Sequence, residues 1–392
     1  MIAPASIPVT GAEAICNVKL LKVLSENGYK IDLISKKMKY THYPETDLAE
    51  LGLSLNSVSI IEVDNKMSLK VIWQHLCCLF IFGTVFKGAH WAYCALKIAK
   101  KLCKENQYDA IITKNSPSEL LGSYFKKKKG YKWIATWNDP YPTEKYPKPY
   151  GKGITAKLFI LEKPLLNQME RADFHIFPNQ RIRDYMRNYL NIPSEKTRII
   201  PHVVIPREHH DTPHENLRIV HLGNILPPRD AAPFLRALKE FIKNEQNAKI
   251  EIAFIGQTPQ SVKDFVNTTH LEKYVKVFPP VKYKESQQIL ESYDIQLIVE
   301  APCEEGIFLP TKVSDSMQLG KPIFTISPSV GVLNDLYKQG HISYFSSLHD
   351  EKNILSTLKQ VYNDFTNGRI KSFSLEESYS PRTIFLQYNE II

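Results

Sequence analysis

Apolar runs of strand length alternate with segments of helical periodicity along almost the whole chain. The runs are short and continuous, as in strands buried on both faces, whereas the longer segments repeat their apolar residues every three or four positions. Such an alternation predicts α/β layering with parallel sheets. In the first half, strands are expected at 30–35, 57–63, 109–113, 132–137, 173–177 and 198–201, and helices at 12–27, 69–105, 118–127, 154–171 and 180–190.

The same rhythm restarts after a polar, unpatterned segment at 207–216. We therefore expect two doubly wound, Rossmann-like domains, 1–206 and 207–370, that face a central cleft, and a closing helix in 371–392 that packs back on the first domain. Ligands of such sheets bind beyond the carboxyl ends of the strands. The second half is expected to contain strands at 217–222, 249–255, 275–278, 295–299 and 322–326, and helices at 231–243, 260–268, 284–293, 311–319 and 352–365.

Length and composition fit a two-domain globular enzyme. A chain of 392 residues exceeds what one hydrophobic core usually covers. Its 50 Lys and Arg against 41 Asp and Glu give a formal charge of +9, which favours anionic partners in general. The lysine run 126–129 has no interleaved aromatic residues, and no zinc-finger or RNP-type motif occurs, so nucleic acid is not expected as a partner.

The six cysteines form no CxxC motif and no zinc-like spacing with histidine, and neither HxH nor HExxH occurs. We therefore expect reduced thiols in a cytoplasmic protein, no disulfide framework and no metal site. No signal peptide is recognisable at the start of the sequence.

The most apolar window, 76–86, is too short to span a bilayer as a helix. Together with lysines 126–129 it is a candidate membrane-surface patch, because apolar residues enter the headgroup layer and lysines attract anionic lipid. The alternative is a core helix and an unrelated solvated helix end.

A candidate anion site follows the strand at 295–299. Pro310 suits a first helical position, and Leu309 before it offers no side-chain cap, so the first N–H groups of the helix are left open. Lys312 adds a cation in the first turn, and Asp315 lies three residues later on the same helix face. A phosphate flanked by hydroxyls, as in a ribose diphosphate, would use both. Alternatively, water or the hydroxyl of Thr311 caps the helix, and Lys312 pairs with Asp315.

The loop 223–230 joins the second domain's first strand to its first helix. Asp230 is a suitable N-cap, and the loop places Arg229 near that helix start. An arginine there can clamp phosphate oxygens bidentately, and Lys312 is expected at the same sheet edge. The alternative is an exposed arginine paired with Asp230.

Two features of the first domain carry weaker indications. Thr10 and Glu13 form a capping box, while Gly11 either lets the backbone approach a ligand or permits the turn. Asp139 follows a strand and begins a loop rich in Pro and Tyr, where a carboxylate could bind sugar hydroxyls or act as a base. Asp before Pro is also an ordinary turn starter. His202 is a further residue that could face the cleft.

Together these segments resemble a glycosyltransferase of the GT-B architecture, close to the family 4 type. The resemblance covers nearly the whole chain, and its strongest parts are Leu222-Gly223-Asn224 with Pro228-Arg229-Asp230, Phe254-Ile255-Gly256, and 305–315 with Gly320-Lys321-Pro322. It implies a nucleotide-sugar in the C-terminal domain and an acceptor in the N-terminal domain.

The resemblance also implies residue roles. Arg229 and Lys312 would neutralise the diphosphate leaving group without a metal ion, Glu305 would face the donor sugar, and Asp315 would bind the ribose hydroxyls. Asp139 falls near the family's N-terminal active-site loop. Gly11 and Gly223 stand where backbone meets the ligand.

The sequence departs from the family at three points. Nine residues separate Glu305 from Asp315 where the family has seven between two glutamates, so Glu304 is a rival for the donor-facing role. The first loop has only Gly11 of the usual glycines, and the strand before it is short.

The resulting expectation is a metal-independent, retaining glycosyltransferase of the hexosyltransferase type. It would need no cofactor beyond its nucleotide-sugar substrate and would serve a lipid-linked or saccharide acceptor in cell-surface polysaccharide biosynthesis. It would be cytoplasmic, peripheral at the inner face of the plasma membrane. The alternatives are a sugar-nucleotide epimerase of the same fold and an inactive GT-B protein that binds a partner.

Overall fold

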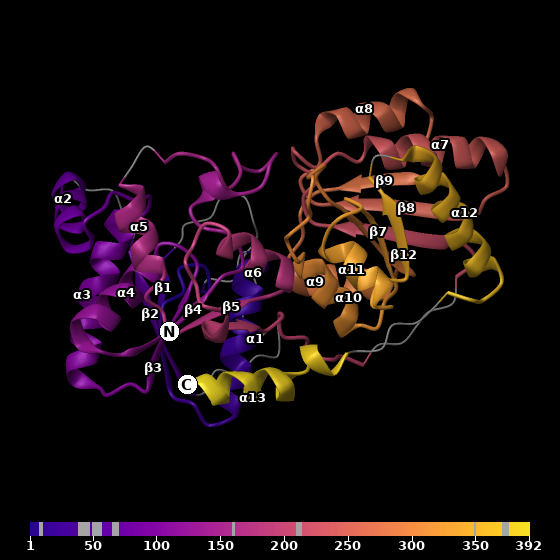
Figure 1. Cartoon of the computed structure of the whole chain (residues 1–392). Helices are drawn as coiled ribbons and strands as arrows, with labels where there is room; N and C mark the ends of the chain where they lie inside the picture. Colours follow the sequence, from indigo (N-terminus) through magenta and orange to yellow (C-terminus); the bar gives the residue numbers. More distant parts are fainter. Residues whose placement is uncertain are drawn as a thin grey trace. The chain divides into compact units, whose positions relative to one another are not determined.

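The chain forms two compact α/β units, which confirms the predicted fold class. The computed structural model describes residues 1–7, 11–37, 48, 57–64, 70–158, 161–208, 214–348, 350–370 and 376–392. The first unit contains Met1–Tyr146, Gly151–Val203 and Ser378–Ile392, and the second contains Pro147–Tyr150 and Val204–Glu377 (Figure 1). The C-terminal helix is thus part of the first unit, and a short piece of the Pro/Tyr-rich loop is part of the second.

Parallel strands form the sheets of the first unit. One sheet pairs β1 with β2, the other has the order β3-β4-β5-β6, and Ile2 bridges to both Ile34 and Thr113, which joins them. The chain therefore runs outward from Ile2 to β2, then returns to β3 on the other side. The strands are β1 (Ile31–Lys36), β2 (Val58–Val63), β3 (Ala110–Lys114), β4 (Lys132–Thr136), β5 (Phe174–Phe177) and β6 (Thr197–Ile199).

The helices of the first unit differ from expectation at two places. The single helix expected at 69–105 is wrong: Gly83 and Gly88 have φ of 67° and 86° and divide it into α2 and α3. The helix expected from 154 begins only at Glu162. The helices are α1 (Ala12–Glu26), α2 (Val71–Phe82), α3 (Ala89–Glu105), α4 (Ser118–Lys129), α5 (Glu162–Met169), α6 (Gln180–Arg187) and α13 (Pro381–Ile391), with 3₁₀ turns at Thr143–Lys145, Ser194–Lys196 and Glu377–Tyr379.

The second unit contains a parallel six-stranded sheet of order β12-β11-β10-β7-β8-β9. The strands are β7 (Leu217–Leu222), β8 (Ile250–Ile255), β9 (Val275–Phe278), β10 (Ile295–Val299), β11 (Ile323–Ser327) and β12 (Tyr344–Ser347). The helices are α7 (Ala232–Asn244), α8 (Gln260–Thr268), α9 (Tyr283–Glu291), α10 (Thr311–Gln318), α11 (Val332–Lys338) and α12 (Glu351–Thr366). Sequence patterning missed β12 and α11.

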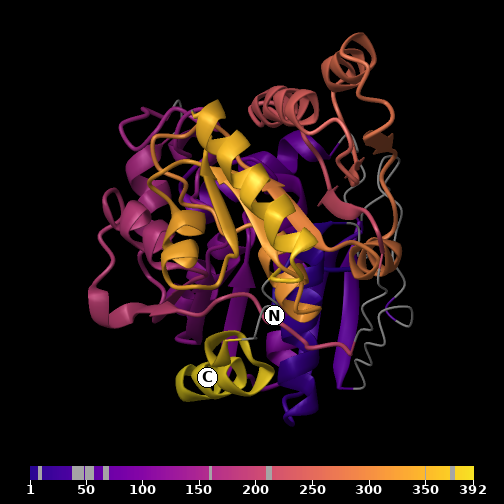
Figure 2. The same cartoon turned by 90° about the vertical axis from the view of Figure 1, so that its right-hand side faces the viewer.

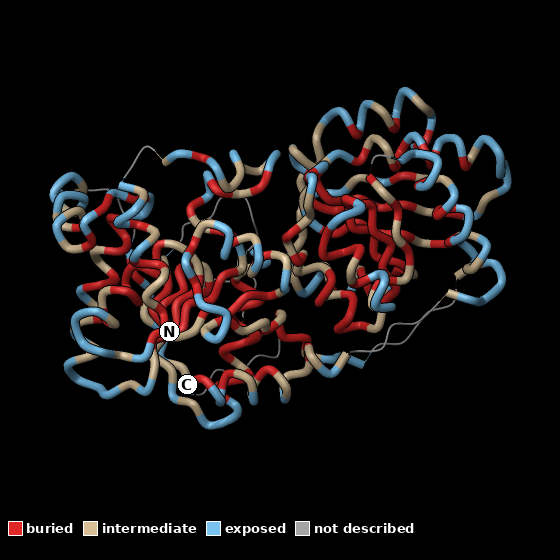
Figure 3. The backbone as a smooth tube through the Cα atoms, in the orientation of Figure 1, coloured by how far each residue is buried: buried red, intermediate tan, exposed pale blue. Residues whose placement is uncertain are grey.

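Helices cover both faces of this sheet, which explains the continuous apolar runs of its strands. In Figure 2, α12 runs diagonally across one face, and in Figure 3 the strands are buried while the outer helix turns are exposed. Phe234 of α7 packs edge-on against Phe254 and Phe324, with ring centroids 6.4 and 6.3 Å away. This core fixes where the ends of β7 and β10 lie.

Candidate functional site

The strand order reverses between β7 and β10, and the candidate site of the second unit lies at this point. From β7 the chain builds outward through β8 and β9, then returns to β10 on the other side of β7. Connections leave the two strands in opposite directions there, and in doubly wound sheets a crevice for ligands lies at the carboxyl ends of the strands at such a reversal. Gly223 follows β7 and Glu300 follows β10.

Helix α10 begins in this crevice without a side-chain cap, as the sequence predicted. The helix begins at Thr311, as the expected range 311–319 has it, but Pro310 is its N-cap and not its first helical residue. The N–H of Val313 is also not open, since it donates to the carbonyl of Pro310 at 3.0 Å. Thr311 and Lys312 therefore present the uncapped N–H groups of the first turn.

The ammonium group of Lys312 lies against a buried histidine. Its Nζ is 3.0 Å from Nε2 of His221, whose Nδ1 lies 3.0 Å from the carbonyl oxygen of Leu297. Burial and the nearby charges of Lys312 and Arg229 hold the pKa of His221 well below its usual value. His221 is therefore neutral. Sequence patterning missed it because it sits inside an apolar strand.

Arg229 pairs with a carboxylate that the sequence analysis did not single out. Its Nε lies 3.6 Å from Oε1 of Glu300, and its guanidinium lies 5.9 Å from the ring centroid of Tyr150. Asp230 is not the N-cap, which is Ala231, but its carboxylate accepts the N–H of Ala232 at 2.9 Å.

Glu300 is buried, and desolvation raises its pKa although Arg229 and Lys312 both oppose the rise. In the sequence, Glu300 could have been recognised as a site residue because it directly follows the apolar strand β10. Glu300 thus faces two cations, Arg229 and Lys312. Two cations from separate loops at one sheet edge suit an anionic ligand.

The two cations influence each other. Burial first, and then the charge of Arg229, lower the pKa of Lys312 to about 7, while Glu300 and Asp315 oppose this shift. Lys312 and Arg229, from two separate loops, are therefore brought together as the sequence predicted. A group placed between them gains from both charges.

Asp315 is held by a tyrosine from a neighbouring helix. The hydroxyl of Tyr283, the first residue of α9, donates to Oδ1 of Asp315 at 2.6 Å. Asp315 also lowers the electrostatic cost of charging Lys312, so it lies on the Lys312 side of α10. Nothing in the sequence pointed to Tyr283.

Two glycines bring backbone close to Lys312. Gly223 has a φ of +98°, and a Cβ there would lie 3.2 Å from Cε of Lys312. Gly256, with a φ of +144°, packs so tightly that a Cβ would lie 2.4 Å from the carbonyl oxygen of Gly223. Side chains at either position would displace the loop that borders the site.

The loop before α10 is tied to the loop after β11. Gly306 donates to the carbonyl of Val330 at 2.9 Å and accepts from Val332 at 2.8 Å. Within this loop Glu305 is half-buried, whereas Glu304 is exposed. Phe308 packs edge-on against Tyr150, with ring centroids 5.3 Å apart.

In the first unit, carboxylates gather where α1 begins and β4 ends. Asp139 accepts a hydrogen bond from Tyr146. Glu13 lies near Asn17, Asn138 and Asp139, and burial raises its pKa to about 7. Glu13 therefore lies in one polar cluster with Asp139.

The predicted capping box involves Thr10, which lies outside the described residues. The N-cap of α1 is Gly11, which makes no side-chain cap. Its φ of −168° is ordinary extended backbone, so this turn does not require glycine, and the space around its Cα is open.

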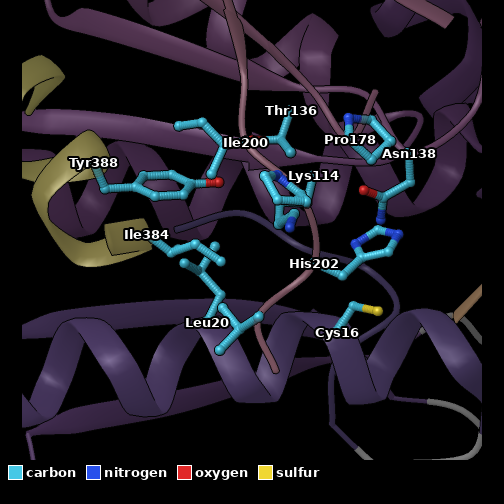
Figure 4. A pocket seen from close by; sticks show the side chains of 12 residues that line it. Cys16, Leu20, Lys114, Thr136, Asn138, Pro178, Ile200, His202, Ile384 and Tyr388 are labelled. Atoms are coloured by element: carbon cyan, nitrogen blue, oxygen red, sulfur yellow. The ribbon is translucent and has the colours of Figure 1, made fainter. Parts of the chain in front are cut away.

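His202 lines a small pocket inside the first unit, together with Lys114 and Tyr388 (Figure 4). Burial and the charges of Lys114 and Lys19 lower its pKa to about 3, so it is neutral. The remaining lining residues are Cys16, Leu20, Thr136, Asn138, Pro178, Ile200, Pro201, Val203 and Ile384.

The two segments of the candidate membrane patch belong to different helices. Helix α2 packs on the start of α3, where Sγ of Cys78 lies 3.2 Å from the carbonyl of Ala89. Lysines 126–129 end α4, whose Tyr124 packs edge-on against Phe82 of α2 with ring centroids 6.4 Å apart. Lys126 pairs with Asp173 at 2.5 Å.

Within the described ranges, no cluster of three or more His, Cys, Asp or Glu side chains could hold a metal ion. In the same part of the chain, no helix combines the length and apolar character needed to cross a bilayer.

Comparison with known proteins defines the class. Residues 17–208 match the model of Glycosyltransferase Family 4. Sucrose-phosphate synthase from Thermosynechococcus elongatus has the same fold, with a TM-score of 0.66 and 14% identity over 100% of this chain and 97% of that one. The chain thus has the GT-B fold, and its N-terminal half is similar to glycosyltransferase family 4. No curated protein matches the sequence.

Two further structures of this fold contain ligands. HepE of Anabaena, in complex with UDP and glucose, has a TM-score of 0.61 and 13% identity over 99% of this chain and 97% of that one. A mutant of S. aureus TarM, in complex with Fondaparinux, alpha-GlcNAc-glycerol and UDP, has a TM-score of 0.62 and 10% identity over 100% of this chain and 98% of that one.

Proposed function

We propose that the second unit binds a nucleotide-sugar and that the enzyme transfers the sugar to a saccharide or lipid-linked acceptor held by the first unit. The observation that carries this proposal is the meeting of Arg229, Lys312 and the uncapped start of α10 at the β7–β10 crevice. Cations and helix N–H groups are what a diphosphate requires, and transfer of the sugar leaves negative charge on that diphosphate.

Each site residue has a proposed role. Arg229 and Lys312 stabilise the diphosphate leaving group in place of a metal ion, and Gly223 lets backbone approach it. Asp315, oriented by Tyr283, accepts hydrogen bonds from the ribose hydroxyls. Glu305 faces the donor sugar. Retention of the anomeric configuration is proposed from the family resemblance.

For the acceptor we propose the first unit, with Asp139 as the carboxylate that orients or deprotonates the attacking hydroxyl. Tyr146 fixes its position, and Gly11 leaves room for the acceptor beside α1. The saccharide ligands of the HepE and TarM structures support a saccharide acceptor, and cell-surface polysaccharide synthesis is the setting we propose.

Incubation with a panel of UDP-, GDP-, ADP- and dTDP-sugars tests the function. We expect calorimetric binding of one nucleotide class, and slow donor hydrolysis or transfer to added saccharides, both independent of added metal and resistant to EDTA. An isomerised donor would instead establish the epimerase, and absence of any nucleotide binding would establish the inactive partner-binding protein.

For the membrane we propose peripheral attachment through one face of α2, defined by Ile72, Trp73, Leu76 and Phe80. These positions fall within about 100° around the helix axis. Trp73 is 63% and Phe80 86% exposed. No acidic residue occurs between Asp64 and Glu105, and lysines precede and follow the helix. Aromatic and apolar side chains beside lysines suit an anionic lipid surface.

Replacing Trp73 and Phe80 together by serine should reduce sedimentation with phosphatidylglycerol vesicles at least several-fold, because two inserted aromatic side chains are lost. Leu386→Ser on α13, also exposed, is the matched control and should sediment like the wild type. Equal sedimentation of both variants and wild type, or concentration-dependent dimerisation lost only in the double variant, would contradict membrane attachment.

A further inference from the structure

Lys312 has an unusual partner for a half-buried lysine in an anion site. Its ammonium group contacts the ring nitrogen of His221 at 3.0 Å, and the structure gives it no direct carboxylate contact within the described part of the chain. His221 lies in the middle of the sheet with none of its surface exposed. It therefore cannot turn away from Lys312 without leaving the core.

The second ring nitrogen fixes the chemistry of the first. Nδ1 lies 3.0 Å from the carbonyl oxygen of Leu297, and the ring also meets the backbone carbonyl of Asn224. Because Nε2 faces the donor Lys312, we assign the proton to Nδ1, which donates to Leu297. Nε2 then has a lone pair, and it points at Nζ of Lys312. Lys312 can donate to this lone pair as an ammonium ion or as a neutral amine.

The charged groups around Lys312 come from three elements. Arg229 approaches from the β7–α7 loop, Glu300 from the end of β10, and Asp315 from α10 itself. Arg229 repels the charged form of Lys312, and Glu300 is already paired with Arg229. A carboxylate in the place of His221 would fix Lys312 in its charged form and compete with any bound phosphate.

We propose that His221 is a positioning residue that holds Lys312 at the diphosphate site without neutralising it, so that donor binding is coupled to uptake of a proton by Lys312. This inference rests on the proposed binding of a nucleotide-sugar. The proton comes from solvent and adds to Nζ of Lys312, while the hydrogen bond from Nζ to Nε2 of His221 is kept.

The direction of the pH dependence follows from linkage. In the ligand-free protein the pKa of Lys312 is lowered to about 7, and a diphosphate brings negative charge that raises it again. The bound state therefore binds more protons than the free state above about pH 7. Affinity should fall with rising pH there, by up to about tenfold per unit, until the pKa of the bound state is reached.

Calorimetric titration tests this with the nucleotide-sugar that binds best in the panel. Its diphosphate is esterified at both ends and does not titrate near neutrality, so it adds no proton change of its own. Titrations at pH 6 and pH 8, in HEPES and in Tris, give the number of protons taken up from the dependence on buffer ionisation enthalpy. We expect uptake of about half a proton or more at pH 8 and much less at pH 6.

Three variants separate the contributions. Lys312→Arg, permanently charged, should bind without proton uptake and with little pH dependence. His221→Phe should weaken binding about tenfold, because Lys312 loses its acceptor. His221→Gln, which keeps an acceptor of similar reach, should recover most of the wild-type affinity and the proton uptake. Unfolding temperatures of all three monitor the fold.

The outcomes separate the role of His221 from the proposed binding of a nucleotide-sugar. If the wild type binds no nucleotide-sugar, the proposed function is wrong. If it binds one with equal affinity at pH 6 and pH 8 and without proton uptake, the function stands and the role of His221 is refuted. Equal affinity of His221→Phe and the wild type at both pH values would also refute it.

Discussion

The two units place their polar side chains at equivalent positions of the fold, but the charged side chains differ in the partners they have. In each sheet the groups lie where the strand order reverses, beside Ile2 and β3 in the first unit and between β7 and β10 in the second. In the second unit the cations have partners: Lys312 contacts His221, and Arg229 pairs with Glu300. In the first unit the carboxyl of Glu119 is buried with a raised pKa, and Lys19, Lys114 and Lys145 are buried as well.

Glu119 shows this contrast best. It lies in the first turn of α4, is 1% exposed, and neither of its oxygens meets a donor from another described residue. Burial raises its pKa to about 8, and Glu13 adds repulsion, so the group is protonated at neutral pH. Protonated carboxyls and amides suit uncharged hydroxyls, whereas the second unit suits an anion. The difference is what the proposed function requires, in which the first unit holds the acceptor and the second the donor.

The largest expected effect is on stability and comes from replacing the buried carboxyl of Glu119. Glu119 has a folded-state pKa above its unfolded value of about 4.5, so its contribution to stability is complete at low pH and is lost as pH rises to about 8. Glu119→Gln removes this loss. We expect the variant to be more stable than the wild type at pH 8, by up to ~4 kcal/mol, and close to it at pH 5, in urea unfolding.

Glu240→Gln on α7 is the control, because this carboxylate is exposed, and it should leave the pH dependence of unfolding unchanged. A Glu119→Gln variant that loses stability equally at both pH values would mean that the carboxylate is charged and paired in the folded protein. The contrast between the two units would then disappear.

The next largest effect is on nucleotide-sugar affinity and comes from removing the positive charge of Lys312 or Arg229. Lys312→Met and Arg229→Met keep much of the apolar stem but remove a charged donor to the diphosphate. Each should weaken nucleotide-sugar binding by about 1.5–3 kcal/mol, roughly 10- to 150-fold, in calorimetry. Arg236→Met on the same unit removes an exposed arginine that pairs with Glu351 at 2.6 Å and should bind like the wild type. Wild-type affinity in both site variants would remove these residues from the phosphate site.

The sequence predicted the ends of several strands of the second unit to the residue, although it missed β12 and α11, and the reason lies in burial. Strands β7, β9 and β10 begin and end where the apolar runs do, because both faces of this sheet are covered. In the first unit the pattern over 69–105 failed, since apolar residues continue through Gly83 and Gly88 and across the exposed face of α2. Periodicity alone could not show that this face lacks a partner within the described residues.

The sequence predicted those parts of the site that lie within single strand–loop–helix segments. The uncapped helix start and the nearness of Lys312 to Arg229 follow from a strand–loop–helix pattern at one sheet edge. His221, Glu300 and Tyr283 were missed, because each acts through a contact with a residue distant in sequence. A histidine in an apolar strand is recognised as a lysine partner only once strand order is known.

The smallest expected effect concerns how closely the backbone approaches Lys312. Gly223→Ala places a Cβ 3.2 Å from Cε of Lys312, at a φ of +98° that alanine adopts only with strain. Lys312 must shift by a few tenths of an ångström to make space, so we expect a loss of about 1 kcal/mol in nucleotide-sugar affinity and a similar loss in stability. Calorimetry and thermal unfolding measure the two separately.

Gly256→Ala is the informative companion to this variant. Its Cβ would lie 2.4 Å from the backbone carbonyl of Gly223, which cannot yield as a side chain can, so it should destabilise the second unit more than Gly223→Ala does. If Gly223→Ala instead lowers stability and leaves affinity unchanged, this glycine serves the packing of the β7 loop alone. The backbone there would then have no part in the anion site, whose selectivity would rest on Arg229, Lys312 and the start of α10.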